Sequence, residues 1–141
     1  MSCNKNNSAS IAFTLAAGST TSPYYGQVNI TQRLCHQTCV SRTPVFQPSF
    51  SVQEVAQVGT GQYVVTVKVE GVISYTTGND QACCTRSQLI SQEFSIPIAS
   101  ATAPTSVTVT PGTTVNAVAA ACCQNTSRTF VSETPLVVTV A

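Results

Sequence analysis

The stretch Tyr63–Glu70, with the sequence YVVTVKVE, decides the fold class of this chain. Its apolar side chains recur at every second position, namely Tyr63, Val65, Val67 and Val69. Successive side chains of a β-strand point to opposite faces, so this alternation predicts a strand that buries one face.

The same two-residue period recurs on both sides of this stretch and predicts about nine strands in total. The same period marks Ile11/Phe13/Leu15, Val28/Ile30, Phe50/Val52, Val107/Val109 and Leu136/Val138/Val140, and apolar stretches at Val72–Tyr75 and around Phe94, Ile96 and Ile98 indicate further strands.

Turn-forming residues separate these runs at Gly59–Gly61, at Thr77–Asp80 and at Pro111-Gly112. Seven prolines exclude long helices through most of the chain, because proline lacks the N–H that a helix interior needs. Only Val115–Cys122 is predicted to form a helical turn.

Short strands without crossover helices pack as antiparallel sheets. The sequence therefore predicts an all-β domain over residues 11–141, an antiparallel β-sandwich of jelly-roll or immunoglobulin-like type. Residues 1–10 are polar and are predicted to form an extended N-terminal arm. The predicted core consists of Phe13, Leu15, Val65, Val67, Phe94, Ile96, Val109, Leu136 and Val138.

The composition restricts the partners of this domain. The chain has 141 residues, of which only 8% are charged, against about 25% in an ordinary soluble domain. The net charge of +1 creates no field that would attract nucleic acid or an anionic membrane. We therefore expect neither as a partner.

Cysteine is unusually frequent for a chain of this length. A high cysteine count is typical of oxidising compartments, yet the N-terminus has no signal-peptide pattern. We therefore expect synthesis in the cytoplasm without a signal peptide and function outside after cell lysis, on a spore surface or in a virion. The seven candidates for disulfides within the chain or between subunits are Cys3, Cys35, Cys39, Cys83, Cys84, Cys122 and Cys123.

Two cysteine pairs, Cys83-Cys84 and Cys122-Cys123, favour cross-linking. Neighbouring side chains on an extended strand face opposite sides, so one cysteine of each pair can bond inside the domain and the other to a neighbour. If all seven are oxidised, the odd number requires at least one bond outside the chain. The alternative is that all of them stay reduced as small core residues.

The sequence predicts no catalytic site and no cofactor. His36 is the only histidine, and adjacent positions on a strand would keep it away from Cys35. The glutamates Glu54, Glu70, Glu93 and Glu133 show no spacing that would bring an acid and a base together.

Cys35, His36 and Cys39 are candidate metal ligands, because they place two thiols and one imidazole within five residues. The chain lacks the Cys-x-x-Cys spacing with which zinc knuckles converge two thiolates, so no metal is predicted. A sugar-binding platform at Tyr24 and Tyr25 is a further alternative, and it would make the protein a carbohydrate-binding module.

The arm with Cys3, the two Cys-Cys pairs and the uncharged β domain loosely resemble the self-assembling subunits of bacterial endospore appendages. That resemblance implies a jelly-roll subunit made without a signal peptide and cross-linked by disulfides into fibres. The family's Cys-Cys pair lies in the arm, whereas this arm carries Cys3 alone. A capsid decoration or head-fibre protein of a tailed bacteriophage would have the same features and is the alternative. Either function predicts that the chain binds copies of itself in a homopolymer or symmetric multimer, with other structural subunits of a surface appendage or capsid as further partners.

Overall fold

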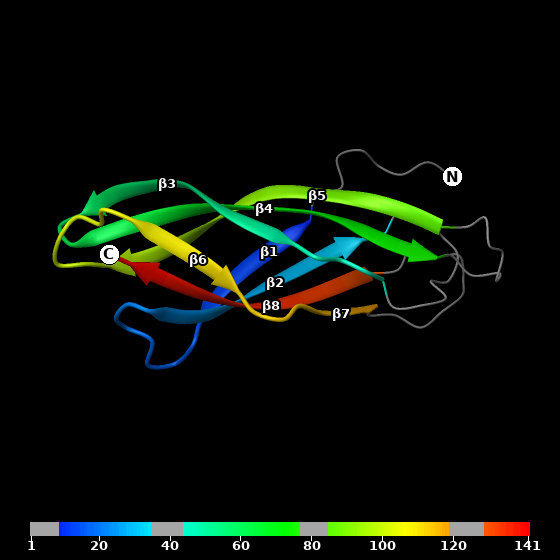
Figure 1. Cartoon of the computed structure of the whole chain (residues 1–141), viewed down its shortest axis with the longest axis horizontal. Coiled ribbons are helices and arrows are strands. Elements are labelled where there is room, and N and C mark those ends of the chain that lie inside the picture. The colour runs from blue at the N-terminus through cyan, green and yellow to red at the C-terminus, as the bar shows by residue number, and fades with distance from the viewer. Residues whose placement is uncertain (1–8, 35–43, 77–84, 119–128) are drawn as a thin grey trace.

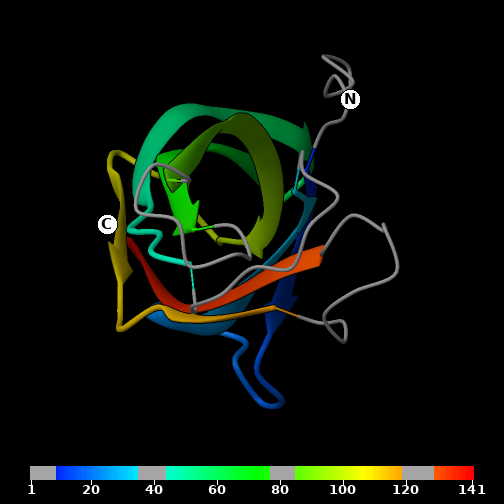
Figure 2. The same cartoon turned by 90° about the vertical axis from the view of Figure 1, so that its right-hand side faces the viewer.

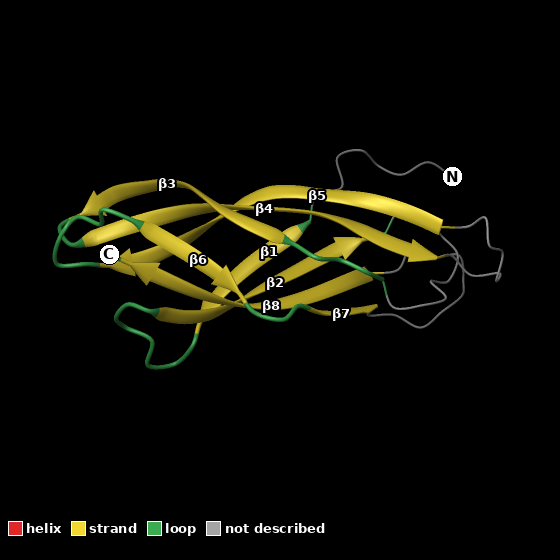
Figure 3. Ribbon diagram, viewed as in Figure 1, coloured by secondary structure: helices red, strands yellow, loops and turns green. Residues whose placement is uncertain are grey.

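The computed structural model describes residues 9–34, 44–76, 85–118 and 129–141. These residues form eight strands and no helix. Figure 3 shows the strands in yellow. The strands are β1 (Ser10–Leu15), β2 (Tyr24–Arg33), β3 (Ser49–Gly59), β4 (Gln62–Thr76), β5 (Thr85–Ala99), β6 (Val107–Pro111), β7 (Val115–Val118) and β8 (Thr129–Val140).

The strands form two antiparallel sheets, which confirms the predicted β-sandwich. One sheet has the order β1-β2-β8-β6, with β7 pairing β8 beyond the end of β6. The other has the order β3-β4-β5. In Figure 1 the strands run along the long axis, and in Figure 2 the three-stranded sheet arches over the five-stranded sheet. Contacts join β1 to β5 at one side and β3 to β6 at the other, and we call these the β1–β5 seam and the β3–β6 seam.

Strand β4 confirms the alternation that decides the fold. Its residues Tyr63, Val65, Val67 and Val69 are all buried. The strand continues through Gly71, so the two strands predicted over this region are one strand of 15 residues. This continuity is one reason why the structure describes eight strands instead of about nine.

The helical turn predicted from Val115 is wrong for the residues that the structure describes. Val115–Val118 form β7, which pairs with β8 in the register Val115↔Glu133 to Val118↔Phe130. Pairing with a neighbouring strand overrides the weak local preference of a short apolar run. Residues 119–122 of the predicted turn lie outside the described part of the chain.

The core lies between the two sheets. Six of the nine predicted core residues are buried, and Phe13, Leu15 and Val109 are partly buried against them. The ring of Phe94 is central, with Phe13 stacked at 6.3 Å and Phe50 edge-on at 6.2 Å between ring centroids. The prediction missed several fully buried side chains, including Phe46, Ile73 and Phe130.

The predicted turn at Gly59–Gly61 is present, whereas Pro111-Gly112 forms a break between two strands that both pair with β8. Gly61 has a φ of 69°, which favours glycine, and it closes the β3–β4 hairpin. At Pro111 strand β6 ends, and the chain leaves β8 before β7 returns to it. Pro135 of β8 lies opposite this break and accepts a hydrogen bond from Gly112 N–H at 2.8 Å. The predicted turn at Thr77–Asp80 lies outside the described residues.

Candidate functional site

None of the seven cysteines, nor His36, falls within the described residues. This also applies to the metal-ligand candidates Cys35, His36 and Cys39. Among the residues that the structure does describe, no three His, Cys, Asp or Glu side chains come together as a metal site.

The segments that carry these residues leave and rejoin the sandwich at one end. Thr76 of β4 pairs with Thr85 of β5, on either side of residues 77–84. In the other sheet, Thr129 at the start of β8 pairs with Arg33 at the end of β2. Gln88 of β5 donates its side-chain N–H to the carbonyl of Arg33 at 3.1 Å, which joins the two sheets there.

The remaining flanks belong to the same end. Val118, the last residue of β7, pairs with Phe130 next to the start of β8. Val45 pairs with Ser74 near the end of β4 through two backbone hydrogen bonds of 2.8 and 2.9 Å. Figure 1 shows this end on the right, where β4 finishes and β5 and β8 begin. We call it the Thr76–Thr85 end.

The N-terminal residues approach the sandwich in the same half. Residues 1–8 are outside the described part of the chain, and Ala9 is buried. Ser10 begins β1 and pairs with Thr31, near the end of β2. Ala9 donates its N–H to the side-chain oxygen of Gln92 in β5 at 2.7 Å. The chain that carries Cys3 therefore meets the body at the β1–β5 seam.

The two tyrosines do not form a joint platform. Tyr24 is buried, and its hydroxyl donates a 2.6 Å hydrogen bond to the carbonyl of Ala99 across the sandwich. Tyr25 is 54% exposed on the outer face of the five-stranded sheet. Adjacent residues on a strand face opposite ways, so only Tyr25 presents a ring to a ligand.

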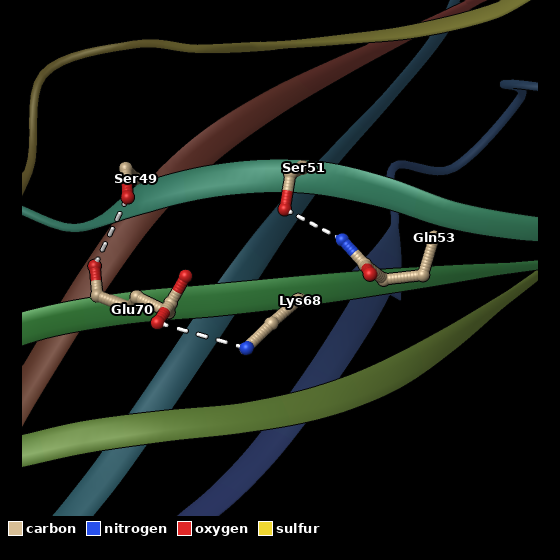
Figure 4. A network of polar contacts seen from close by, with 5 residues as sticks. All are labelled: Ser49, Ser51, Gln53, Lys68 and Glu70. Carbon is tan, nitrogen blue, oxygen red and sulfur yellow. Dashed lines mark hydrogen bonds and ion pairs between the residues drawn. The ribbon is translucent and has the colours of Figure 1, made fainter.

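The four glutamates do not converge on an acid–base pair. All four are exposed, and Glu133 lies in the opposite sheet from the other three. Glu70 forms an ion pair with Lys68 at 3.7 Å within the polar network on β3 and β4 in Figure 4. The network also includes Gln53 donating to Ser51 at 2.8 Å and Ser49 donating to the Glu70 carbonyl at 3.3 Å. This network lies on the solvent-exposed surface of the sheet.

The sequence interpretation missed an open groove of about 570 Å³ along the β3–β6 seam. The chain before β3 forms one wall, over Pro44–Pro48, and the break between β6 and β7 forms the other, over Pro111–Thr114 with Asn116. Among the lining prolines, Pro44 and Pro48 only argue against a helix and Pro111 predicts a turn, while Asn116 is a lone polar residue in an apolar run. That single asparagine was the one available signal.

Comparisons with known proteins do not assign a family. A scan against protein-family models gave no match, and searches of the curated proteins and of the solved structures gave none either. No helix in the part of the chain that the structure describes is long and apolar enough to cross a membrane. What the protein does therefore has to be inferred from its own residues and geometry.

Proposed function

We propose that this protein is a non-catalytic structural subunit that self-assembles into a disulfide-stabilised extracellular fibre or surface layer, similar to a spore appendage. The observation that carries the proposal is the shared attachment of three cysteine-bearing segments, residues 35–43, 77–84 and 119–128, to the Thr76–Thr85 end. Six of the seven cysteines belong to these segments. An end at which three cysteine-bearing segments join the sandwich is suited to linking one subunit to the next.

The edges of both sheets support association. Within the described residues, β1 pairs only with β2, β3 only with β4, and β5 only with β4. Such edges offer backbone N–H and C=O groups to another strand. A chain with 8% charged residues and a net charge of +1 provides little repulsion between copies.

Exposed apolar side chains at the Thr76–Thr85 end give the same indication. Val72 and Leu89 are cross-strand partners on the outer face of β4 and β5, and they are 49% and 67% exposed. Val45, 61% exposed, lies beside Ser74 on the same face. Contact with a second copy would remove this apolar area from water, which stabilises association.

Electron microscopy and gels with and without reductant test the proposal. We expect ordered polymers that resist heat and detergent until a reductant is added. The combined change Cys83→Ser and Cys84→Ser should remove that resistance, whereas Thr102→Ser, an exposed change in the β5–β6 connection, should leave it intact.

A strictly monomeric protein with the same gel mobility under both conditions would contradict the polymer and its cross-links. Ordered multimers that need no disulfide, or that form only on a capsid, would instead favour the virion protein.

A further inference from the structure

The outer face of the five-stranded sheet, which points away from the three-stranded sheet in Figure 2, presents the ring of Tyr25 to solvent. The connection between β1 and β2 holds the backbone of this residue on both sides. The Tyr25 N–H donates to the Ser19 hydroxyl at 2.8 Å, and the Tyr25 carbonyl accepts from the Ala16 N–H at 2.8 Å. The exposed ring is therefore carried by a fixed part of the strand.

Two amide side chains follow this ring along β2. Gln27 and Asn29 alternate with buried residues, so they lie on the same face as Tyr25, and both are half-buried. Gln27 Nε2 donates to Asn29 Oδ1 at 2.7 Å. This bond orients both amides and leaves the Asn29 N–H groups and the Gln27 oxygen for a ligand. Side chains that are already oriented lose less entropy when a ligand binds.

Strand β8 extends this surface on one side. Residues directly opposite each other in an antiparallel pair share a face of the sheet. The residues opposite Tyr25, Gln27 and Asn29 are, in that order, Val137, Pro135 and Glu133. We call these six residues the Tyr25 strip. It combines an apolar part, made of the tyrosine, valine and proline, with a polar part, made of the two amides and the carboxylate.

The size and charge of the Tyr25 strip restrict its ligand. A stable protein–protein interface covers about 800 Å² on each partner. A whole tyrosine buries only about 150–250 Å², so the apolar part of the strip is too small to be the centre of such an interface. The exposed Glu133 carboxylate disfavours phosphate and other acidic ligands. A small neutral ligand with an apolar face and a polar rim fits both restrictions, and a sugar ring has this form.

We propose that the Tyr25 strip binds a neutral, linear polysaccharide. The C–H face of one sugar stacks on the Tyr25 ring, and a hydroxyl of the next sugar accepts from the Asn29 N–H and donates to the Gln27 oxygen. This inference goes beyond the proposed function and does not depend on it. In an assembly of many copies, the repeated strip would bind a polysaccharide surface through many weak contacts.

Calorimetric titration of the full chain with cellohexaose and with chitohexaose, in the presence of reductant, tests the inference. We expect at least one hexasaccharide to bind. Tyr25→Ala should weaken this binding by about tenfold or more, and Tyr25→Phe should stay within about twofold, because the ring provides the stacking. The matched control is Val58→Ala, which shortens an exposed apolar side chain in the other sheet and should change nothing. Urea denaturation verifies that each variant folds.

Tyrosine fluorescence gives a second measurement that is local to the strip. The chain has four tyrosines and no tryptophan, and Tyr24, Tyr63 and Tyr75 are buried. Quenching by acrylamide therefore reports mainly on Tyr25. The bound hexasaccharide should reduce this quenching, and Gln27→Ala should require more hexasaccharide for the same reduction.

Three results would overturn the inference. The first is that neither hexasaccharide binds at millimolar concentrations. The second is that binding persists in Tyr25→Ala or leaves the quenching unchanged, because the sugar then lies elsewhere. The third is that acidic oligogalacturonate binds as tightly as the neutral sugars. None of these results bears on self-assembly, which the microscopy and the gels test separately.

Discussion

Each of the two seams of the sandwich contains a pair of phenylalanine rings and a hydrogen-bonded amide side chain, but the seams differ in how completely they close. At the β1–β5 seam, Phe13 stacks on Phe94, and the buried Ala9 gives its N–H to Gln92. At the β3–β6 seam, Phe46 packs edge-on against Phe130 at 5.6 Å between ring centroids, and Asn116 bonds the Phe46 carbonyl. Among the residues that the structure describes, the second seam has an open groove and an amide oxygen without a partner.

A phenylalanine ring over a glycine appears at each seam. A Cβ on Gly26 would collide with the ring of Phe13, and a Cβ on Gly71 would lie 2.5 Å from Cε1 of Phe46. Both glycines therefore make room for a ring that seals one side of the core. The two rings differ in burial, since Phe46 is fully buried and Phe13 only partly so, and the polar groups beside them differ as well.

The largest expected effect separates the two rings. Phe46 is 1% exposed and Phe13 is only partly buried, so Phe46→Ala should lower the free energy of unfolding by about 3–5 kcal/mol. Phe13→Ala should lower it by about 1–3 kcal/mol, because less apolar area leaves water there. Urea denaturation in the presence of reductant measures both. Equal losses would mean that the seams are equally buried.

The two amide side chains give a smaller and more specific contrast. Gln92→Ala leaves the buried N–H of Ala9 without an acceptor and should cost about 1–3 kcal/mol. Asn116→Ala also breaks a bond, but it removes a buried oxygen that has no partner. The lost hydrogen bond and the removed oxygen have opposite effects on stability. Asn116→Ala should therefore lower the free energy of unfolding by less than about 1 kcal/mol.

The same denaturation experiment checks this contrast, with amide exchange at Ala9 as a local measurement. A cost for Asn116→Ala that matches that of Gln92→Ala would show that the amide oxygen is satisfied after all.

The smallest expected effect concerns two buried hydroxyls on β8. Ser132→Ala removes a group without a partner and should be neutral or stabilise the protein by up to about 1 kcal/mol. Its matched control is Thr134→Val, which removes a hydroxyl that is hydrogen-bonded to Thr114 at 2.8 Å, and it should cost about 1 kcal/mol. Thermal unfolding of both variants compares them. Similar losses would indicate a buried water bound to Ser132.

Period-two patterning predicted the sandwich because burial of one sheet face imposes that pattern on the residues themselves. It missed Phe46 because that residue lies outside any regular strand, where no pattern marks burial. It assigned the wrong structure to Val115–Val118, since a short apolar run has no period of its own and only pairing with β8 decides it. The groove lies between the chain before β3 and the break between β6 and β7, two segments far apart in the sequence, and only the lone polar Asn116 hints at it.

The shared attachment of the cysteine segments was equally beyond local patterns. Cysteine spacing identified candidates for cross-linking, but it did not show that residues 35–43, 77–84 and 119–128 join the sandwich at one end. That follows from the pairing of Arg33 with Thr129 and of Thr76 with Thr85, which connects distant parts of the chain.

The pairing of β2 with β8 also has a consequence for synthesis on the ribosome. Beyond the register of the two strands, Ser22 and Val140 are joined by a hydrogen bond across 118 positions. The β3-β4-β5 sheet consists of consecutive hairpins and can form as soon as those residues emerge. The β1–β2 hairpin has to wait until β8 has been translated before it gains its central partner. Until then the β3-β4-β5 sheet and the β1–β2 hairpin expose apolar side chains that the complete five-stranded sheet buries.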